Sequence, residues 1–218
     1  MPHPLNVIIN RANIVCSTSI AMKELIEKDY KRFDVFDVPF GIDIKLFEPK
    51  KIEHKKFIVG TIKSIEMHNG IDCLLDAADI VVNEYKKDIH FLIVGKGSLS
   101  NKMIEKAESL NLLKNVSFTG FVNHEKAINY YSRLSIFVAV STRESFGVSV
   151  LEAASCGIPS ITSNIGGLKE VNINNITGIV IEPNEPKSLA NSIIKLYNNK
   201  SLRLSLGSKG RERVKNKY

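Results

Sequence analysis

Ile136-Phe-Val-Ala-Val140 is followed, three residues later, by Glu144-Ser-Phe-Gly-Val-Ser-Val-Leu-Glu152. The first run is short and wholly apolar, which is typical of a buried strand, and residues 150–154 continue as a helix. Glu144 should therefore lie on a strand-to-helix loop, with Glu152 two turns into the helix. A strand that leads through a loop into a helix is the unit from which α/β folds are built.

This loop joins two kinds of ligand-binding group. Carboxylates such as Glu144 and Glu152 accept hydrogen bonds from sugar hydroxyls, and the first N–H groups of a helix are free to bind phosphate. Each carboxylate alone also has a plainer interpretation, as an ordinary charge of a loop or of a helix surface. A ligand that needs both kinds of group is a nucleotide sugar.

The alternation of strand and helix extends from residue 57 onward. Apolar residues recur at helical spacing between residues 71 and 85 and again between residues 189 and 197, and Pro186 suits the first turn of the second helix. Strands that are apolar throughout indicate that helices cover both faces of the sheet. The pattern predicts an α/β protein with a doubly wound parallel sheet. The predicted strands are 57–60, 90–94, 115–118, 135–140, 159–162 and 178–181.

Residues 1–45 do not fit this pattern as a further unit. Residues 12–16 predict one strand, and residues 19–26 predict one short helix. The lysine-rich run 50–56 predicts a solvated linker. The chain therefore divides into a short N-terminal part, 1–45, and an α/β domain, 46–218.

Composition limits the classes of partner. The chain has 30 Lys and Arg residues against 23 Asp and Glu residues, a formal net charge of +7. This balance favours anionic partners such as phosphates or an acidic membrane face, although lysines that keep a surface solvated give the same count. The sequence contains no arginine-rich helix or RNA-binding motif, so we expect no nucleic acid partner.

Location and metal content are also constrained. The sequence has no apolar run of about eighteen residues, the length that a transmembrane helix needs. Its three cysteines follow no metal or redox spacing, which is typical of a protein of the reducing cytoplasm. The sequence also contains no Asp-x-Asp motif.

The spacing of Glu144 and Glu152 resembles the E-x7-E motif of retaining glycosyltransferases of family 4, which have the two-domain GT-B architecture. The resemblance covers nearly the whole chain and rests on the order of several short motifs. It implies that residues 46–218 are the Rossmann-like, nucleotide-sugar-binding C-terminal half of a GT-B fold. Residues 1–45 would be a remnant of the acceptor-binding N-terminal domain and the linker. The supporting motifs are Pro39-Phe-Gly-Ile-Asp43, Val59-Gly-Thr-Ile62, Leu92-Ile-Val-Gly-Lys-Gly97, Val116-Ser-Phe-Thr-Gly-Phe-Val122 and Ser163-Asn-Ile-Gly-Gly167.

The resemblance also assigns roles to individual residues. Glu152 matches the glutamate that binds the ribose hydroxyls, and Glu144 matches the one beside the transferred sugar, the candidate catalytic residue. Gly60 would end the first strand at the ligand-binding edge of the sheet. Backbone groups of the remaining positions would contact the sugar, the diphosphate or the nucleobase. These donor-binding candidates are Ser145, Phe146, Gly147, Val148, Phe121 and Val122.

Two positions depart from the family pattern. The arginine and the lysine that hold the diphosphate in the family are replaced by Thr61 and Asn69. Lys63 would supply the charge from a shifted position, and His68 is a second candidate. The alternative is that Lys63 is a solvated loop lysine and that donor binding is weak.

The implied activity is transfer of a hexose from a UDP- or GDP-sugar to a glycan or lipid-linked acceptor, with retention and without a metal or other cofactor. Synthesis of bacterial surface polysaccharide or lipopolysaccharide is the expected setting, in the cytoplasm or at the inner face of the membrane. One alternative is a non-catalytic nucleotide-sugar-binding half that needs a separate acceptor domain. Another is a different GT-B enzyme, such as an epimerase or a phosphorylase, although we find no motif for the pyridoxal phosphate lysine of a phosphorylase.

Overall fold

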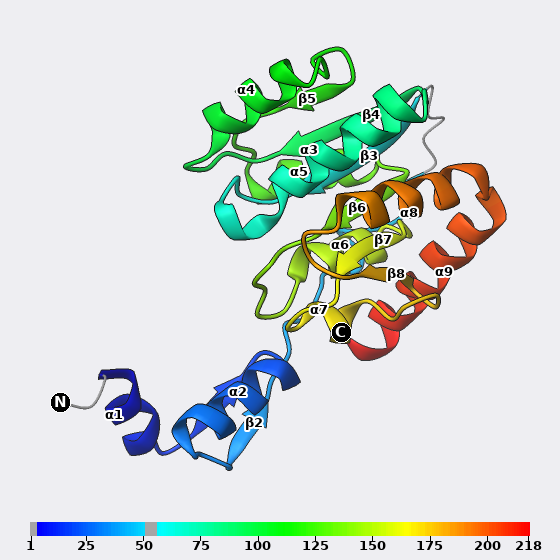
Figure 1. Ribbon diagram of the computed structural model, residues 1–218. Coiled ribbons are helices and arrows are strands. Elements are labelled where there is room, and N and C mark those ends of the chain that lie inside the picture. The colour runs from blue at the N-terminus through cyan, green and yellow to red at the C-terminus, as the bar shows by residue number, and fades with distance from the viewer. Residues whose placement is uncertain (1–3, 51–55) are drawn as a thin grey trace.

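The structure is a computed structural model that describes residues 4–50 and 56–218. Most of the linker predicted at 50–56 lies outside the described residues. Figure 1 shows a small N-terminal unit, in blue, that lies to one side of a larger layered α/β body.

The larger body is built on six parallel strands in the order β5-β4-β3-β6-β7-β8. All six strands predicted from the sequence are present, with ends that differ by at most two residues. Helices lie on both sides of the sheet (Figure 1), so the predicted doubly wound α/β fold is confirmed. The strands are β3 (Phe57–Ile62), β4 (Ile89–Val94), β5 (Val116–Phe118), β6 (Ile136–Ala139), β7 (Ser160–Ser163) and β8 (Gly178–Ile181).

The strand order reverses at the centre of the sheet. From β3 the chain proceeds outward through β4 to β5, and then returns to place β6 on the other side of β3. In open α/β sheets, ligands bind beyond the carboxyl ends of the strands at such a reversal. A ligand site is therefore expected at the loops that follow β3 and β6.

The core consists of two apolar layers, one on each face of the sheet. Along β4, Phe91 and Ile93 pack into one layer, and Leu92 and Val94 pack into the other. Each fully buried side chain of this size contributes about 2 kcal/mol of hydrophobic free energy. The first layer is covered by α3 (Ile71–Asp79), α4 (Ser100–Ser109) and α8 (Pro186–Asn198), and the second by α5 (His124–Tyr131) and α6 (Val148–Ser155).

Two helices predicted from apolar spacing are confirmed, with one difference in form. Pro186 begins α8, as expected. The helix predicted over 71–85 is regular only to Asp79 and continues as a π-helical turn, Ile80–Glu84, in which Tyr85 N donates to Ile80 O at 2.9 Å.

The N-terminal unit contains more helices and strands than the one strand and one helix that the sequence predicted. It contains α1 (Pro4–Arg11), β1 (Val15–Ser17), α2 (Ile20–Tyr30) and β2 (Val35–Asp37). The predicted strand and helix are β1 and α2, whereas α1 and β2 were not predicted; β1 and β2 pair in parallel across α2 as a separate two-stranded sheet. Three-residue strands are too short to show an apolar period, which is why β2 was missed.

The last helix, α9 (Lys200–Lys217), packs against α6 and carries most of the net positive charge of the chain. It holds seven cationic residues against one glutamate, and so accounts for six of the seven net charges of the chain. Near its end, Arg213 donates to the backbone oxygen of Glu170 in the short helix α7 (Leu168–Val171) at 2.7 Å. Among residues 4–50 and 56–218, no helix has both the length and the hydropathy that crossing a membrane requires.

Candidate active site

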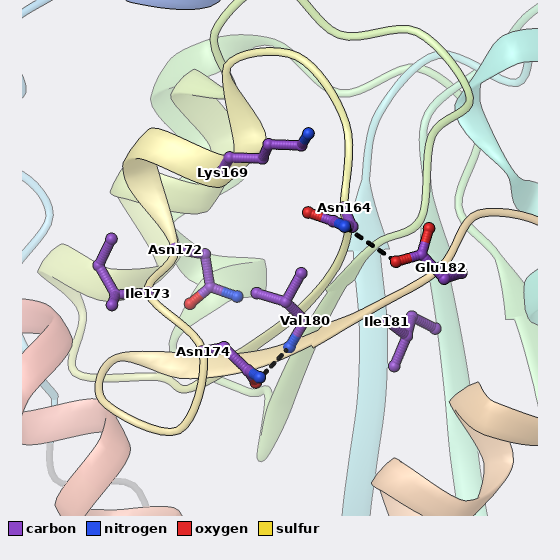
Figure 2. Close-up of a pocket in the computed structure, with 8 residues that line it drawn as sticks. All are labelled: Asn164, Lys169, Asn172, Ile173, Asn174, Val180, Ile181 and Glu182. Atoms are coloured by element: carbon purple, nitrogen blue, oxygen red, sulfur yellow. Dashed lines mark hydrogen bonds between the residues drawn. The ribbon is translucent and has the colours of Figure 1, made fainter.

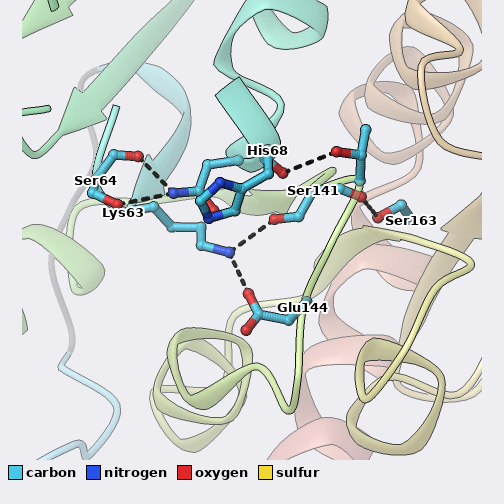
Figure 3. Close-up of polar contacts among 8 residues, drawn as sticks. Lys63, Ser64, His68, Ser141, Glu144 and Ser163 are labelled. Atoms are coloured by element: carbon cyan, nitrogen blue, oxygen red, sulfur yellow. Dashed lines mark hydrogen bonds and ion pairs between the residues drawn. The ribbon is translucent and has the colours of Figure 1, made fainter. Parts of the chain in front are cut away.

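Lys63 and Glu144 meet at the carboxyl edge of the sheet, where the strand order reverses. Lys63 directly follows β3, and Glu144 lies in the loop after β6. The Lys63 ammonium donates to a carboxylate oxygen of Glu144 and, at 2.8 Å, to Ser141 Oγ (Figure 3). The two side chains are only 11% and 20% exposed. The sequence suggested each residue separately, and the structure joins them in one ion pair.

Hydrogen bonds from neighbouring strands hold the backbone on both sides of this pair. Lys63 N donates to Val94 O at 3.0 Å, which ties the residue to the end of β4. Ser163 Oγ donates to Ser141 O at 2.5 Å, which ties the loop after β6 to the end of β7 (Figure 3). The charged groups are therefore positioned by the sheet and not by a free loop.

The loop after β7 supports the backbone of Glu144 directly. Gly167 N donates to Glu144 O at 3.2 Å. The preceding Gly166 has a φ of 42°, and a Cβ there would lie 2.1 Å from the same Glu144 oxygen. Only glycine permits this conformation together with such a close approach.

An open pocket of about 460 Å³ surrounds the ion pair. Arg143 and His68 line it too, and both side chains can carry positive charge. The sequence suggested His68 as a candidate, but nothing in the spacing marked Arg143. Cations beside a carboxylate can bind phosphate and sugar hydroxyls at once. The lining residues are Lys63, Ser64, His68, Asn69, Arg143, Glu144 and Ser145.

The two positions where the family pattern has cations serve the local fold instead. Thr61 is buried within β3. Asn69 is buried as well, and its Nδ2 donates to both the backbone oxygen and Oγ of Ser64 at 2.9 Å. The Asn69 amide thus fixes the turn that follows Lys63. Lys63, two residues after Thr61, is the cation that pairs with Glu144.

The predicted placement of Gly60 at a strand end was wrong. β3 runs two residues further, to Ile62, and Gly60 is buried within it. A Cβ at this position would lie 2.6 Å from Leu134 Cδ2 and 2.8 Å from Leu92 O. The absence of a side chain makes room for the core and the neighbouring strand. Contact between Gly60 and a donor stays a prediction.

The segment between the two glutamates presents the open end of α6, as the sequence predicted. Gly147 precedes the helix with no side-chain cap, and the first backbone hydrogen bond of the helix is donated by Val150, to Gly147 O at 3.0 Å. Phe146 is buried against Phe40 and Tyr218, with ring centroids 5.7 and 5.8 Å apart. Its ring therefore belongs to the core, and contact of its backbone with a donor stays a prediction.

Glu152 lies on the second turn of α6 and is almost completely buried. One carboxylate oxygen accepts a hydrogen bond of 2.6 Å from the Tyr131 hydroxyl, and the other lies 3.6 Å from His124 Nδ1. The surface-glutamate interpretation is therefore wrong. Burial raises the pKa of Glu152, while the Tyr131 hydrogen bond and His124 oppose that rise. Burial also raises the pKa of Tyr131 well above its usual value, so its hydroxyl stays a donor.

Phe121 and Val122 lie in the loop between β5 and α5. Phe121 is 78% exposed and Val122 is half-buried. Asn123 caps α5 by accepting from Lys126 N at 3.1 Å, and His124 is the first residue of the helix. This loop therefore approaches Glu152 through His124, and none of its residues lines the Lys63–Glu144 pocket.

A separate hollow of about 410 Å³ lies beside the edge strand β8, and none of the predicted site residues lines it (Figure 2). Its polar groups largely satisfy one another. Asn164 Nδ2 donates to Glu182 Oε1 at 2.8 Å, and Val180 N donates to Asn174 Oδ1 at 3.1 Å. The hollow at the strand reversal is the better candidate site because charged groups from the two loops after β3 and β6 converge there.

Comparison with known proteins gives the family. The family of glycosyl transferases group 1 matches residues 43–213. The capsular polysaccharide biosynthesis glycosyltransferase CapM of Staphylococcus aureus is 30% identical over 181 residues, which cover 82% of this chain and 47% of CapM. The chain thus spans about half the length of that relative.

Solved structures agree with the fold. A mutant of S. aureus TarM in complex with fondaparinux, α-GlcNAc-glycerol and UDP superposes with a TM-score of 0.90 at 27% identity, over 98% of this chain and 42% of TarM. The C-terminal domain of a glycosyl transferase group 1 protein from Francisella tularensis superposes with a TM-score of 0.75 at 23% identity, over 82% of this chain and 98% of that domain. The second likeness shows the fold alone. Together with the sequence match, these findings show that this chain belongs to the glycosyl transferases group 1 family and has the Rossmann-like architecture of GT-B proteins.

Proposed function

We propose that this chain is the donor-binding part of a retaining glycosyltransferase of family 4. It would transfer a hexose from a UDP- or GDP-sugar to a glycan or lipid-linked acceptor, without a metal or other cofactor. The observation that carries the proposal is the pairing of Lys63 with Glu144 at the strand reversal, beside the open N-terminus of α6. TarM, whose structure contains UDP, supports the nucleotide part of the proposal.

The ligand would lie along the segment that joins the two glutamates. The diphosphate would bind the backbone N–H groups of residues 146–148 and the ammonium of Lys63. The sugar would lie next to Glu144 and Ser145, and the ribose would reach Glu152. Phe121 and Val122 would contact the base.

The chemistry would break the bond between the anomeric carbon and the diphosphate oxygen. The diphosphate would leave with the electron pair and take up the proton that the acceptor hydroxyl gives up as its oxygen bonds to the anomeric carbon on the same face. Negative charge grows on the leaving oxygen, so Lys63 and the fixed N–H groups would stabilise the transition state more than the bound donor. Glu144 would orient the sugar and keep Lys63 in place.

A surface polysaccharide or a lipid-linked precursor is the proposed class of product, because CapM acts in capsular polysaccharide biosynthesis. The basic surface of α9 would assist association with an anionic membrane face from the cytoplasmic side.

A second candidate function is supported by the N-terminal unit. Many of its large apolar side chains are exposed, among them Ile8, Phe33 and Phe36 at 64%, 70% and 59%. Exposed apolar groups gathered on a small unit are typical of a surface that another domain covers. On this alternative the chain is a donor-binding half that becomes catalytic only with a separate acceptor domain.

Calorimetric titration of the purified chain with UDP and then GDP tests the donor site. We expect saturable binding of one nucleotide, and Glu152→Ala should abolish it. Failure of a folded wild-type chain to bind either nucleotide would overturn the proposal. Measurement of sugar transfer by the same sample then separates the two candidates, because a half enzyme should bind donor and transfer little or nothing.

A further inference from the structure

Glu152 is held by a second helix. Tyr131 and His124 both come from α5, seven residues apart, and this spacing places them on the same face of the helix. Tyr131 donates to Oε2 of Glu152 at 2.6 Å, and His124 Nδ1 lies 3.6 Å from Oε1. One oxygen of the carboxylate is therefore engaged, and the other is not hydrogen-bonded to the histidine, because 3.6 Å exceeds a hydrogen-bond distance.

The engaged side is rigid. Tyr131 is fully buried, and its ring packs against Phe47 and Phe137 with centroids 5.8 and 5.6 Å apart. A buried tyrosine with its ring fixed on two sides can hold its hydroxyl in only one place. Oε2 is therefore fixed to the core of the domain.

The other oxygen of Glu152, Oε1, lies next to a solvent-exposed side chain. The His124 side chain is 66% exposed, and its ring packs on Phe47 at 5.4 Å. Oε1 thus lies between a buried anchor and a solvent-exposed ring, at the end of the loop that carries Val122. Oε1 is therefore the carboxylate oxygen that is left for a ligand hydroxyl.

We propose that Tyr131 is a positioning residue that turns the Glu152 carboxylate so that Oε1 accepts a ribose hydroxyl of the donor. This rests on the proposed function, since it assumes that Glu152 binds ribose. It extends that function because the Tyr131 hydroxyl, on α5, sets the orientation of the Glu152 carboxylate on α6. Without that hydroxyl, the buried carboxylate loses its fixed partner and its directional preference.

The test compares ligands that differ only at the ribose. The purified chain is titrated with UDP and with 2′,3′-dideoxy-UDP, and likewise with the two guanosine forms, and the affinity ratio of the ribo to the dideoxy ligand is measured. Tyr131→Phe should reduce this ratio about tenfold, the effect of one lost charge-assisted hydrogen bond. The affinity for the dideoxy ligand should stay unchanged, which a general loss of structure would not allow.

The neighbouring Tyr130 offers a matched control. It belongs to the same helix, is half-buried and faces Arg133, and Tyr130→Phe removes the same atom. This variant should keep the wild-type ratio. In a Glu152→Gln background, Tyr131→Phe should have no further effect on the ratio, because its effect passes through the carboxylate.

The outcomes separate the two proposals. If the folded wild-type chain binds no nucleotide, the proposed function fails and this inference fails with it. If Glu152→Gln lowers the ratio and Tyr131→Phe does not, only the inference is overturned. Should Tyr131→Phe fail to fold, wild-type chain labelled with fluorotyrosine serves instead. The fluorine resonance of Tyr131 should then move with UDP or GDP and not with the dideoxy form, and an equal response to both would overturn the inference.

Discussion

The carboxylate of Glu170 accepts a hydrogen bond of 2.8 Å from the backbone N–H of Ala21, 149 residues earlier in the chain. The same carboxylate accepts from Ile20 N at 3.0 Å. These are the first two N–H groups of α2, so Glu170 caps a helix of the N-terminal unit from within the donor domain. The loop before α7 also supports Glu144, so one short segment connects the N-terminal unit with the candidate site.

Glu170→Ala should release the start of α2. Loss of a charged cap costs about 1 kcal/mol, so amide hydrogen exchange at Ile20 and Ala21 should accelerate roughly fivefold. Exchange in the six-stranded sheet should not change. Glu105→Ala, at an exposed glutamate of α4, is the control. Unchanged protection of the two amides would show that Glu170 does not hold the unit.

Lys63→Ala should weaken binding of UDP or GDP about tenfold, because it removes a charge-assisted contact to the diphosphate. Binding of uridine or guanosine, which lack phosphate, should be unaffected. Calorimetry with the four ligands measures both effects. Lys187→Ala, at an exposed position of α8, keeps the same net charge as the test variant and should bind like wild type. Equal losses for nucleoside and nucleotide would contradict a phosphate contact.

The ribo-to-dideoxy affinity ratio should depend on pH. Burial raises the pKa of Glu152. The carboxylate must be ionised to accept hydrogen bonds from both the Tyr131 hydroxyl and a ribose hydroxyl. The ratio should therefore fall as the pH is lowered through that raised pKa, above the range in which an exposed glutamate titrates. Titration of the ligand phosphates cancels in the ratio. A Glu152→Gln variant should show a flat profile, and a sloping one would assign the effect to another group.

The same pKa shift has the opposite sign for stability. A carboxyl whose pKa is raised on folding binds its proton more tightly in the folded state, so its contribution to stability is present at low pH and is lost as the pH rises through the folded-state pKa. Glu152→Gln keeps an acceptor for Tyr131 and buries no charge. Its melting temperature at pH 7.5 should equal or exceed that of wild type, and a clear decrease would contradict this account.

Gly166→Ala should damage the site through the backbone of Glu144. A Cβ 2.1 Å from the Glu144 oxygen forces a shift, and overpacking of this kind costs about 1–3 kcal/mol. Both the melting temperature and nucleotide affinity should fall. Gly120→Ala separates crowding from backbone strain, since Gly120 has a φ of 73° and no atom within 4 Å of its would-be Cβ. It should cost about 1 kcal/mol and leave affinity intact.

Regular features of the fold could be predicted because they repeat. Apolar runs separated by helical periods gave all six strands of the large sheet, and the loop position of Glu144 followed from them. The short strand Val35–Asp37 could not be predicted, since three residues carry no period. Gly60 was predicted at the end of its strand and lies within it. Glycine is favoured both at a strand end and where the core packs close to the backbone, so the residue type did not distinguish the two positions.

Contacts between distant segments were the part of the site that could not be predicted. Tyr131 has no spacing relation to Glu152, and only the packing of α5 on α6 brings them together. The side chain of Asn69 supports a turn at a position where the family pattern suggested a lost cation. Lys63 was identified because it lies two residues after Thr61, where the family pattern has an arginine. Arg143 lies near no position at which the family pattern has a cation, so it was not identified.

The concentration of charge on α9 has a consequence for how the molecule behaves in solution. Outside this helix the formal net charge is only +1, so the protein approximates a neutral body with a cationic rod along one side. Such a particle has a preferred orientation at any anionic interface. On a cation-exchange resin it should adsorb by one edge, and the opposite edge of the molecule should then remain open to solvent.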